Sequence, residues 1–343
     1  MSAMSLNTTS SPQPASQPLL EIDLAAAVVT LSQHAPQILV ARKTGQESAS
    51  PDLWSLPSGR FDPAQSRTLE IALRGFVSKQ AGCELGYVEQ LYTFGDRGRA
   101  AESEEGHRHV VSIGYLALTN PLAGDFNLPQ TARFCPWYGF FPWEDWRAGR
   151  PAILDREIMP QLMAWAADSQ GERAERARRA LPREARLRLC FGVNGSPWDE
   201  EKVLERYELL YEAGLLEEAR RDGRRAALAR PSLPVLGDAM THDHRRILAT
   251  AMGRLRAKLK YRPVVFELMA DHFTLTDLQQ TVEAISGRHV HKQNFRRFVE
   301  NASLVEPTGQ HLMTRGRPAQ LFRFRPDVLQ ERPAPGLRLH GRG

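Results

Sequence analysis

The stretch TLEIALRGFVSKQAG, residues 68–82, predicts an amphipathic helix in the first half of this 343-residue chain. Its apolar residues stand at positions 69, 72, 73, 76 and 77, which is the spacing of one helix face. Gly82 stands where such a helix would end, because glycine readily adopts the left-handed conformation found at helix C-termini. The segments on both sides of this helix have a different composition, which is typical of strands.

Strand composition, rich in Val and Ile, occurs in EIDLAAAVVTL (21–31), QILVARK (37–43), YVEQLYTFG (87–95) and HVVSIGYLALT (109–119). The first two segments are expected to be joined by a short turn around Ala35 and Pro36. REIMPQLMAWAADS (156–169) predicts a second helix. Because strands and helices alternate in this way, residues 21–168 are expected to form an α+β domain.

The rest of the chain divides by composition. Residues 1–20 are rich in Ser, Pro, Thr and Gln, lack the features of a signal peptide and are expected to form a disordered tail. Residues 169–239 contain charged helical stretches, one of them expected at 199–221, and we interpret them as a helical extension of the first domain. Residues 240–328 are expected to form a separate unit, followed by a flexible tail at 329–343.

The charges are divided unevenly along the chain. Residues 240–343 hold 18 Lys and Arg against 9 Asp and Glu, whereas residues 1–239 hold 27 against 31. This predicts that only the C-terminal part contacts a polyanion. Three widely spaced cysteines, Cys83, Cys135 and Cys190, form no zinc or disulfide pattern and fit a cytoplasmic protein. The sequence has no apolar run of about 18 residues, so we expect no membrane span.

The C-terminal unit has the order of a winged helix-turn-helix, with helices, a tight glycine turn and a two-stranded hairpin. Helices are predicted for residues 241–261, 263–270, 274–286 and 289–303. The last helix would pack Phe295, Phe298, Val299 and Ala302 on the domain and turn its opposite face to a major groove. That face carries four candidate DNA contacts, Lys292, Gln293, Arg296 and Arg297. The alternative is a basic face exposed to solvent.

The hairpin predicted after this helix favours the DNA interpretation. Arg315 and Arg317 flank a glycine at the tip of the wing, where guanidinium groups suit a narrow minor groove or a phosphate ridge. In the second strand, Phe322 and Phe324 alternate with arginines, so that one side packs and the other stays charged. Helix and wing together predict binding to double-stranded DNA.

The helix at 68–82 lacks the acidic residues that a Nudix hydrolase has at this place. In such a hydrolase, carboxylates one turn apart on the helix share Mg²⁺ with a diphosphate. Gly59, Arg74 and Gly82 can fill the glycine and arginine positions of that motif, with Gly82 one residue late. The glutamate positions hold Gly75, Ser78 and Lys79. A lysine near the place of a divalent ion predicts that no metal site and no catalytic residue occur here.

Four stretches of the sequence resemble the Nudix-related transcription regulators of NAD metabolism, which comprise the NrtR group and, more closely, the NadQ-type regulators of proteobacteria. They are LWSLPSGRFDP, LEIALRGFVSKQAGCELGYVEQLYTFGDRGR, HVVSIGYLALT and the C-terminal segments from LRAKLKYRPVVFELM to RGRPAQLFRF, which together span roughly residues 50–120 and 254–326. The resemblance implies an α+β chain with an N-terminal Nudix-like α/β/α sandwich domain, a helical extension and a C-terminal winged helix-turn-helix.

The resemblance also implies a repressor of NAD biosynthesis genes that binds a palindromic operator as a homodimer. Its Nudix-like domain would bind an adenine nucleotide (NAD, ATP or ADP-ribose) as an effector without cleaving it, and the chain would need no resident cofactor. A diphosphate needs guanidinium groups, and an adenine needs an aromatic or arginine face. The candidate contacts are Arg42, Trp54, Arg60, Tyr92, Phe94, Arg97, Arg99 and Arg108. For each of them the alternative is a surface charge or a core aromatic residue.

Two other functions remain open on the sequence. An active Nudix hydrolase with an accessory nucleic-acid-binding domain would need carboxylates from outside the helix, and the acidic loop nearby offers Glu102, Glu104 and Glu105. An RNA-associated scaffold is disfavoured by the helix-turn-helix and wing, because readers of single-stranded RNA usually present aromatic residues on a sheet.

Overall fold

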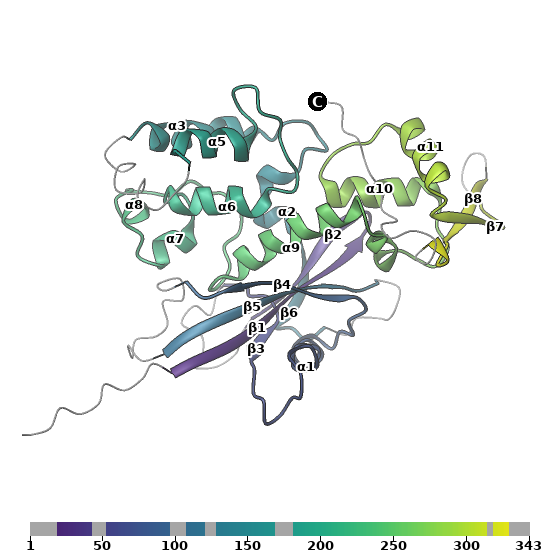
Figure 1. Ribbon diagram of the computed structural model, residues 1–343, viewed down its shortest axis with the longest axis horizontal. Coiled ribbons are helices and arrows are strands. Elements are labelled where there is room, and N and C mark those ends of the chain that lie inside the picture. The colour runs from purple at the N-terminus through teal and green to yellow at the C-terminus, as the bar shows by residue number, and fades with distance from the viewer. Residues whose placement is uncertain are drawn as a thin grey trace, which may run out of the picture.

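The computed structural model describes residues 19–42, 53–96, 108–120, 128–168, 181–313 and 318–328. Figure 1 shows a twisted sheet with helix α1 on one side and the other labelled helices on the opposite side. A small two-stranded hairpin, β7 and β8, lies at the far end of the helical layer beside α11. The chain is therefore an α+β protein, as predicted.

Six strands form the sheet in the order β4–β5–β1–β2–β6, with β3 paired to β1. Their bounds are β1 Leu19–Ser32, β2 Ala35–Ala41, β3 Ser58–Arg60, β4 Val88–Phe94, β5 Arg108–Leu118 and β6 Ala132–Pro136. β1 and β5 run parallel, whereas the other strand pairs are antiparallel. Where β1 and β5 are fully buried, at residues 24–29 and 113–118, their sequences are almost entirely apolar, as expected for strands covered on both faces. The four strand segments expected from composition are all present.

The turn between β1 and β2 lies two residues earlier than predicted. Gln33 and His34 form it with φ angles of 49° and 58°, and Ser32 pairs directly with Ala35. Positive φ at both central residues is the conformation that suits a two-residue hairpin. Pro36 lies in β2 instead, because a proline φ near −65° cannot supply the positive angle that this turn requires.

Helix α1 (Leu69–Ala81) confirms the helix predicted at 68–82. The hydroxyl of Thr68 accepts a hydrogen bond from the backbone N–H of Ile71 at 3.2 Å, which caps the first turn. Gly82 ends the helix with a φ of 57°, the left-handed conformation that glycine adopts without strain. The face buried against the sheet is formed by Ala72, Leu73, Val77 and Ala81.

Helices from the middle of the chain lie on the opposite side of the sheet. They are α2 Trp137–Phe140, η1 Pro142–Glu144, η2 Leu154–Ile158, α3 Met159–Ala167, α5 Arg183–Phe191, α6 Val203–Glu212, α7 Glu217–Arg221 and α8 Arg225–Leu228. The helix predicted at 156–169 is present, but it starts with the π-type turn η2. Pro160 has no backbone N–H to continue the ordinary pattern, and the N–H of Met159 reaches back to the carbonyl of Leu154.

The single helix expected at 199–221 is wrong, because the structure has two helices there, α6 and α7. Gly214 lies between them with a φ of 69°. A Cβ atom at this position would come within 2.4 Å of the backbone of α8. Only glycine permits both this conformation and this close approach, so the chain turns here and α8 packs against it.

The C-terminal unit has the predicted order of helices and hairpin. Its elements are α9 His244–Leu259, η3 Val264–Leu268, α10 Leu275–Ser286, α11 Lys292–Ala302, β7 Val305–Leu312 and β8 Ala319–Phe324. The segment predicted as a helix at 263–270 forms the short 3₁₀ helix η3. α9 packs against the sheet, against α6 and against α10, and it therefore connects the sheet domain to the C-terminal unit.

In the described part of the chain, no helix is both long and apolar enough to cross a membrane. The cysteines Cys83, Cys135 and Cys190 are free thiols.

Candidate functional site

Helix α11 has one buried and one exposed face, divided as the sequence predicts. Phe295 and Val299 are buried, and Phe298 and Ala302 are partly buried against the same core. The opposite face exposes Lys292, Gln293, Arg296 and Arg297. Within the described residues, none of these four side chains forms an ion pair or side-chain hydrogen bond. Three cations therefore stand along an exposed helix without anionic partners, as an interface for a polyanion requires.

The turn before α11 is held by Glu283 of α10. One carboxylate oxygen accepts a hydrogen bond from the backbone N–H of Val290 at 2.8 Å, and the other lies 3.1 Å from Nδ1 of His289. Gln279 donates to the Glu283 carboxylate at 3.0 Å and also to the carbonyl of Val290 at 2.9 Å. Burial tends to raise the pKa of Glu283, but these hydrogen bonds outweigh it and the pKa is lowered. A charged carboxylate thus fixes the angle between α10 and α11.

The hairpin packs against the start of the same unit. Phe273 forms backbone hydrogen bonds in both directions with Phe322, and the ring of Phe324 stacks on Phe266 with centroids 4.5 Å apart. Arg323 points outward and pairs with a glutamate on β7. The hairpin strands are thus placed as predicted, whereas the tip residues Arg315 and Arg317 lie outside the described residues.

On α1, the positions where a Nudix hydrolase has glutamates are exposed. Gly75, Ser78 and Lys79 all face solvent, and an added Cβ at Gly75 would meet no atom within 4 Å. The next residue, Gln80, hydrogen-bonds both the N–H and the carbonyl of Ser58, at 3.1 and 2.6 Å. An amide thus joins the helix to β3. Among the described residues, no group of three or more His, Cys, Asp or Glu side chains is arranged to hold a metal ion.

The structure brings two predicted effector contacts together with a third residue. The guanidinium carbons of Arg42 and Arg133 lie 4.3 and 4.2 Å from the centroid of the Trp54 ring. We call these three residues the Trp54 cluster. Sequence reasoning missed Arg133, because its place beside Trp54 follows from the pairing of β2 with β6, and nothing in the local sequence of β6 signals it.

The other predicted effector contacts lie elsewhere. Arg60 on β3 pairs with Glu21 at 2.5 Å. Tyr92 is exposed on β4, but Phe94 is only 3% exposed and lies beneath the guanidinium of Arg246, so its ring belongs to the core. Arg97 and Arg99 lie outside the described residues, as do Glu102, Glu104 and Glu105, and Arg108 is described only as the backbone that begins β5. Of the predicted contacts whose side chains are described, the structure therefore brings together only Arg42 and Trp54.

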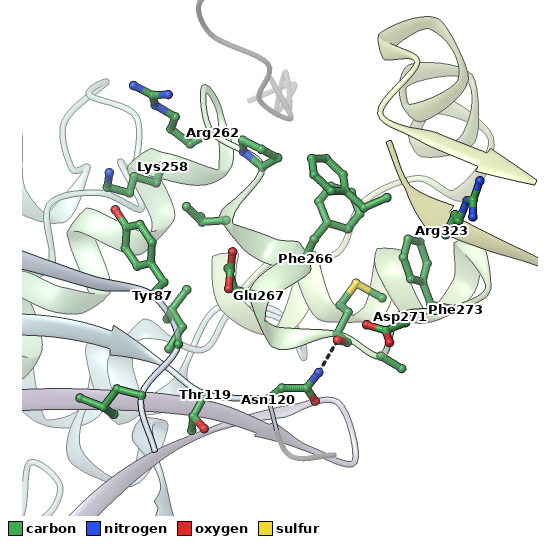
Figure 2. A pocket seen from close by; sticks show the side chains of 18 of the residues that line it. Tyr87, Thr119, Asn120, Lys258, Arg262, Phe266, Glu267, Asp271, Phe273 and Arg323 are labelled. Atoms are coloured by element: carbon green, nitrogen blue, oxygen red, sulfur yellow. Dashed lines mark hydrogen bonds between the residues drawn. The ribbon is translucent and has the colours of Figure 1, made fainter. Parts of the chain in front are cut away.

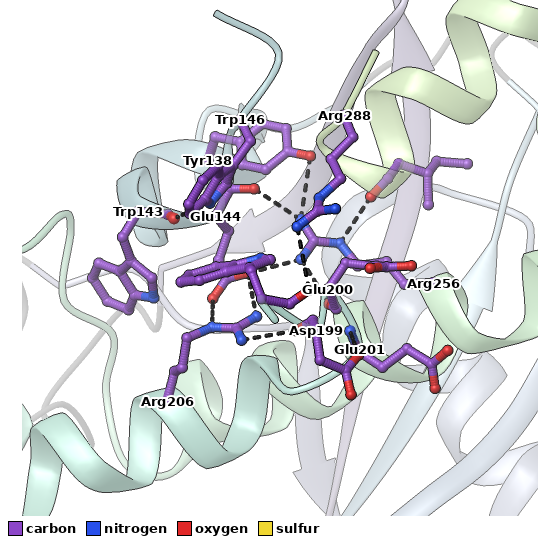
Figure 3. Close-up of polar contacts among 12 residues, drawn as sticks. Tyr138, Trp143, Glu144, Trp146, Asp199, Glu200, Glu201, Arg206, Arg256 and Arg288 are labelled. Carbon is purple, nitrogen blue, oxygen red and sulfur yellow. Dashed lines mark hydrogen bonds and ion pairs between the residues drawn. The ribbon is translucent and has the colours of Figure 1, made fainter. Parts of the chain in front are cut away.

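Figure 3 shows a buried ionic cluster formed by Glu144, Arg206 and Arg256, which we call the Glu144 node. Arg206 donates to both carboxylate oxygens at 2.6 and 2.8 Å, and Arg256 donates to one of them at 2.8 Å. Each of the three side chains is at most 1% exposed. Burial by itself raises the pKa of Glu144, but the two guanidinium groups outweigh it and hold the pKa below its ordinary value.

The Glu144 node joins parts of the chain that are distant in sequence. Glu144 belongs to η1, Arg206 to α6 and Arg256 to α9. Arg256 also donates to the carbonyl of Ile285 in α10 at 3.0 Å. The Glu144 carboxylate therefore connects α6 of the helical extension to α9. Arg256 then connects α9 to α10, the first helix of the helix-turn-helix.

A cleft of about 930 Å³ separates the sheet domain from the C-terminal unit. In Figure 2, Tyr87, Thr119 and Asn120 line one side, and Phe266 and the wing residue Arg323 line the other. The amide of Asn120 crosses the boundary to the carbonyl of Met269 at 2.8 Å. The charged side chains of the lining are Glu84, Lys258, Arg262, Glu267, Asp271 and Arg323. Because the lining carries both positive and negative side chains, its charge does not indicate whether a bound ligand would be an anion or a cation.

Comparison with known proteins identifies the C-terminal unit. Residues 265–324, from η3 to the end of β8, match the family described as "NrtR DNA-binding winged helix domain". The C-terminal unit is an NrtR-type winged helix domain. Its α11 occupies the position of the second helix of a helix-turn-helix, which is the element that enters the major groove in such proteins.

Two further comparisons match longer parts of the chain than these 60 residues. The chain is 40% identical over 85 residues to the "ADPR responsive transcriptional repressor NtrR" of Acinetobacter baylyi. The aligned residues make up 25% of this chain and 34% of that protein. The matched part thus spans about a third of that relative's length. A crystal structure of Shewanella oneidensis NrtR with a 27mer DNA superposes with a TM-score of 0.53 at 19% identity, covering 90% of this chain and 95% of that one. At this identity the likeness shows the fold.

The NrtR fold accounts for both ends of the chain. A second structure of Shewanella oneidensis NrtR matches with a TM-score of 0.52 at 18% identity and again covers 90% of this chain. The N-terminal sheet with α1 therefore shares the fold of the Shewanella oneidensis protein, and α9 leads from it to the winged helix that matches the NrtR family. The expected resemblance to the NrtR group is confirmed at the level of the C-terminal domain and of the overall fold.

Proposed function

We propose that this chain is a transcriptional repressor whose winged helix binds an operator in double-stranded DNA and whose Nudix-like domain binds a nucleotide effector. The observation that carries the proposal is the exposed face of α11, where Lys292, Arg296 and Arg297 have no anionic partner among the described residues. This face belongs to a domain matched to the NrtR DNA-binding family. The combination of a winged helix with a Nudix-like sheet supports the proposal that one chain binds both DNA and a ligand.

ADP-ribose is the effector that we propose first. The Acinetobacter baylyi relative is described as an ADPR-responsive repressor, and its matched part is 40% identical to this chain. NAD and ATP share the adenosine diphosphate part of ADP-ribose and serve as the comparison ligands. The genes controlled are proposed to be those of NAD biosynthesis, and the chain is proposed to bind its operator as a homodimer in the cytoplasm.

The Nudix-like domain is proposed to bind its nucleotide without hydrolysing it. The helix positions that would supply carboxylates to Mg²⁺ hold Gly75, Ser78 and Lys79. Carboxylates are the ligands that Mg²⁺ prefers together with substrate phosphates, and a lysine at this place repels the ion. A sensor also gains from this change, because hydrolysis would remove the signal.

The repressor proposal is tested by binding to DNA. An operator is selected from a library of random duplexes with the purified chain, and its affinity is measured by fluorescence anisotropy with and without ADP-ribose, NAD or ATP. We expect one of these nucleotides to change the affinity by about 5- to 150-fold, the usual range of coupling between two sites. A chain that selects no duplex, or whose duplex affinity none of the three nucleotides alters, contradicts the proposal.

The absence of hydrolysis is tested separately. The chain is incubated with ADP-ribose and Mg²⁺, and released AMP is measured against a reaction without protein. We expect no release above that background. Metal-dependent AMP release by the purified chain would favour the alternative function, a Nudix hydrolase with an accessory nucleic-acid-binding domain.

A further inference from the structure

We propose that the Trp54 cluster is a binding site for the diphosphate group of a nucleotide, on the face of the sheet opposite α1. The assignment of this diphosphate to the effector rests on the function proposed above. The site differs from the place of the Nudix helix, and it includes Arg133, which the sequence did not single out.

The strand register places all three side chains on one face of the sheet. Ser55 bridges to Ala41 in antiparallel fashion, so that Trp54 lies opposite Arg42. Arg133 on β6 is paired with Val40, which precedes Arg42 by two residues. Residues opposite each other, or two apart on neighbouring strands, point to the same face.

That face is the one covered by the helical layer. Val40 belongs to the core beneath those helices, and Trp54 packs against the same core. Leu39 and Ala41, which alternate with Val40 and Arg42, belong to the core beneath α1. The cluster is therefore separated from α1 by the thickness of the sheet.

The charges of the cluster are not balanced within the described residues. Arg42 and Arg133 are exposed, and neither forms an ion pair there. Their guanidinium carbons lie no more than about 8.5 Å apart, which is the two distances of 4.3 and 4.2 Å to the same ring taken together. Burial raises the pKa of the neighbouring Cys135 thiol, whereas Arg133 lowers it through its charge and a hydrogen bond, and Asp238 raises it slightly. Among the described residues, Asp238 forms no ion pair with either arginine. Two like charges held this close are complemented by a ligand with two negative charges.

Two other described arginines that contact the sheet domain do not offer this chemistry. Arg60 is occupied by Glu21, and Arg246 is paired with Asp96 at 2.6 Å and with Glu208 at 2.5 Å. In the Trp54 cluster, by contrast, two planar guanidinium groups contact one indole, and neither is paired with a carboxylate among the described residues, although Arg133 also hydrogen-bonds the Cys135 thiol. Guanidinium groups bind phosphate oxygens through paired N–H donors, and a diphosphate offers such oxygens at both phosphorus atoms.

The cluster is connected to the start of α9. The carbonyl of Trp54 accepts a hydrogen bond from the N–H of Thr241 at 3.1 Å. The N–H of Leu56 donates to Nδ1 of His244, the first residue of α9, at 3.0 Å. A ligand that moves Trp54 therefore acts on the residues that begin the bridging helix, which runs to the winged helix domain.

A DNA phosphate is a poorer occupant of this site. β2 begins beside the winged helix domain, since Gln37 pairs with Pro136 and the nearby hydroxyl of Tyr138 donates to the carbonyl of Ala284 in α10 at 2.7 Å. Arg42 lies five residues after Gln37. At a rise of about 3.3 Å per residue, this places the two about 16 Å apart along the strand. The cluster thus lies at the end of β2 that is distant from α10. A DNA duplex bound to the exposed face of α11 would therefore not contact the cluster.

The test measures binding of inorganic pyrophosphate and of ADP-ribose by calorimetry to the full chain and to Arg133→Ala, Arg42→Ala and Arg133→Lys. Arg188→Ala, at an exposed arginine on α5, is the matched control. We expect either alanine change to weaken pyrophosphate binding by about tenfold or more, because a charge-assisted contact is lost, while Arg188→Ala leaves it unchanged. Arg133→Lys keeps the charge without the planar fork, and it should give an intermediate loss.

The outcomes separate this inference from the proposed function. If ADP-ribose alters operator binding while Arg133→Ala and Arg42→Ala bind pyrophosphate and ADP-ribose like the unmodified chain, the inference is wrong and the repressor function stands. If the unmodified chain binds pyrophosphate through these arginines but no nucleotide alters operator affinity, the site stands and the sensing function fails. A loss of DNA affinity in Arg133→Ala without nucleotide would assign the cluster to DNA and overturn the inference. Thermal melting checks that each variant is folded, and Arg133→Lys serves if the alanine variant is not.

Discussion

The Glu144 node and the Trp54 cluster each bring two arginines together, but among the described residues the positive charges are neutralised by a carboxylate only in the node. In the node, one buried carboxylate accepts from both guanidinium groups, and the remaining N–H donors reach backbone carbonyls such as that of Ile285. In the cluster, two exposed guanidinium groups share one indole and have no carboxylate partner within the described residues. The first arrangement is complete without a ligand, whereas the second is completed by one.

This difference follows from the cost of removing charge from water. An uncompensated ion in a buried place costs several kcal/mol, so Arg206 and Arg256 can be buried only because Glu144 and carbonyl groups satisfy them. Arg42 and Arg133 remain in contact with solvent, which screens their repulsion and permits an unpaired state. The comparison predicts that changes in the node act on folding and changes in the cluster act on binding.

The largest effect is expected for Glu144→Ala. Removing the carboxylate leaves two buried guanidinium groups without their anion, and the free energy of unfolding should fall by about 3–5 kcal/mol. Denaturant titration of the full chain measures it, with Glu157→Ala, at an exposed glutamate of η2, as the control. A loss of unfolding free energy no larger than that of the control would show that the node does not stabilise the fold, and would contradict the contrast with the Trp54 cluster.

The pH dependence of stability should identify the charge of Glu144 as the cause. Its pKa is lowered in the folded chain, so the node contributes its full stability above the ordinary carboxyl pKa of about 4.3 and loses it as the pH falls through the folded value. The difference in unfolding free energy between the unmodified chain and Glu144→Gln, measured between pH 7 and 3, should therefore shrink toward low pH. A difference that stays constant would mean that shape, and not charge, decides.

A smaller effect is expected on α11, where exposed arginines again have no partner in the part of the chain that the structure describes. Arg296→Ala should weaken binding to the selected operator by about 1–3 kcal/mol if Arg296 contacts a base, or lower the salt dependence by about one charge if it contacts a phosphate. Anisotropy titrations at several salt concentrations distinguish the two, with Arg188→Ala as the control. Unchanged affinity and unchanged salt dependence would contradict a DNA contact at this position.

The smallest effect is expected for the stability of Arg133→Ala. Since this arginine is exposed and unpaired within the described residues, its loss should change the free energy of unfolding by less than about 0.5 kcal/mol, although ligand binding falls. Thermal melting without and with pyrophosphate measures both: the melting temperature should match that of the unmodified chain alone and rise less with the ligand. A large loss of stability without ligand would make the cluster structural, like the node.

The sequence alone determined the elements whose pattern is local. The helix at 68–82 follows from apolar spacing and from Gly82, and the division of α11 into a packed and a charged face follows from positions three and four apart. The strand segments and the winged helix order follow from the same kind of evidence. The missing carboxylates at Gly75, Ser78 and Lys79 are likewise visible in the sequence.

The features that depend on contacts between distant residues could not be predicted without the three-dimensional structure. The break between α6 and α7 comes from the close approach of α8 to Gly214, and the turn at Gln33 and His34 comes from the register of β1 with β2. Arg133 reaches Trp54 because β6 pairs with β2, and the Glu144 node joins residues 112 positions apart, Glu144 and Arg256. Local propensity carries no information on such pairings, because strand register and helix packing are set by burial over the whole domain.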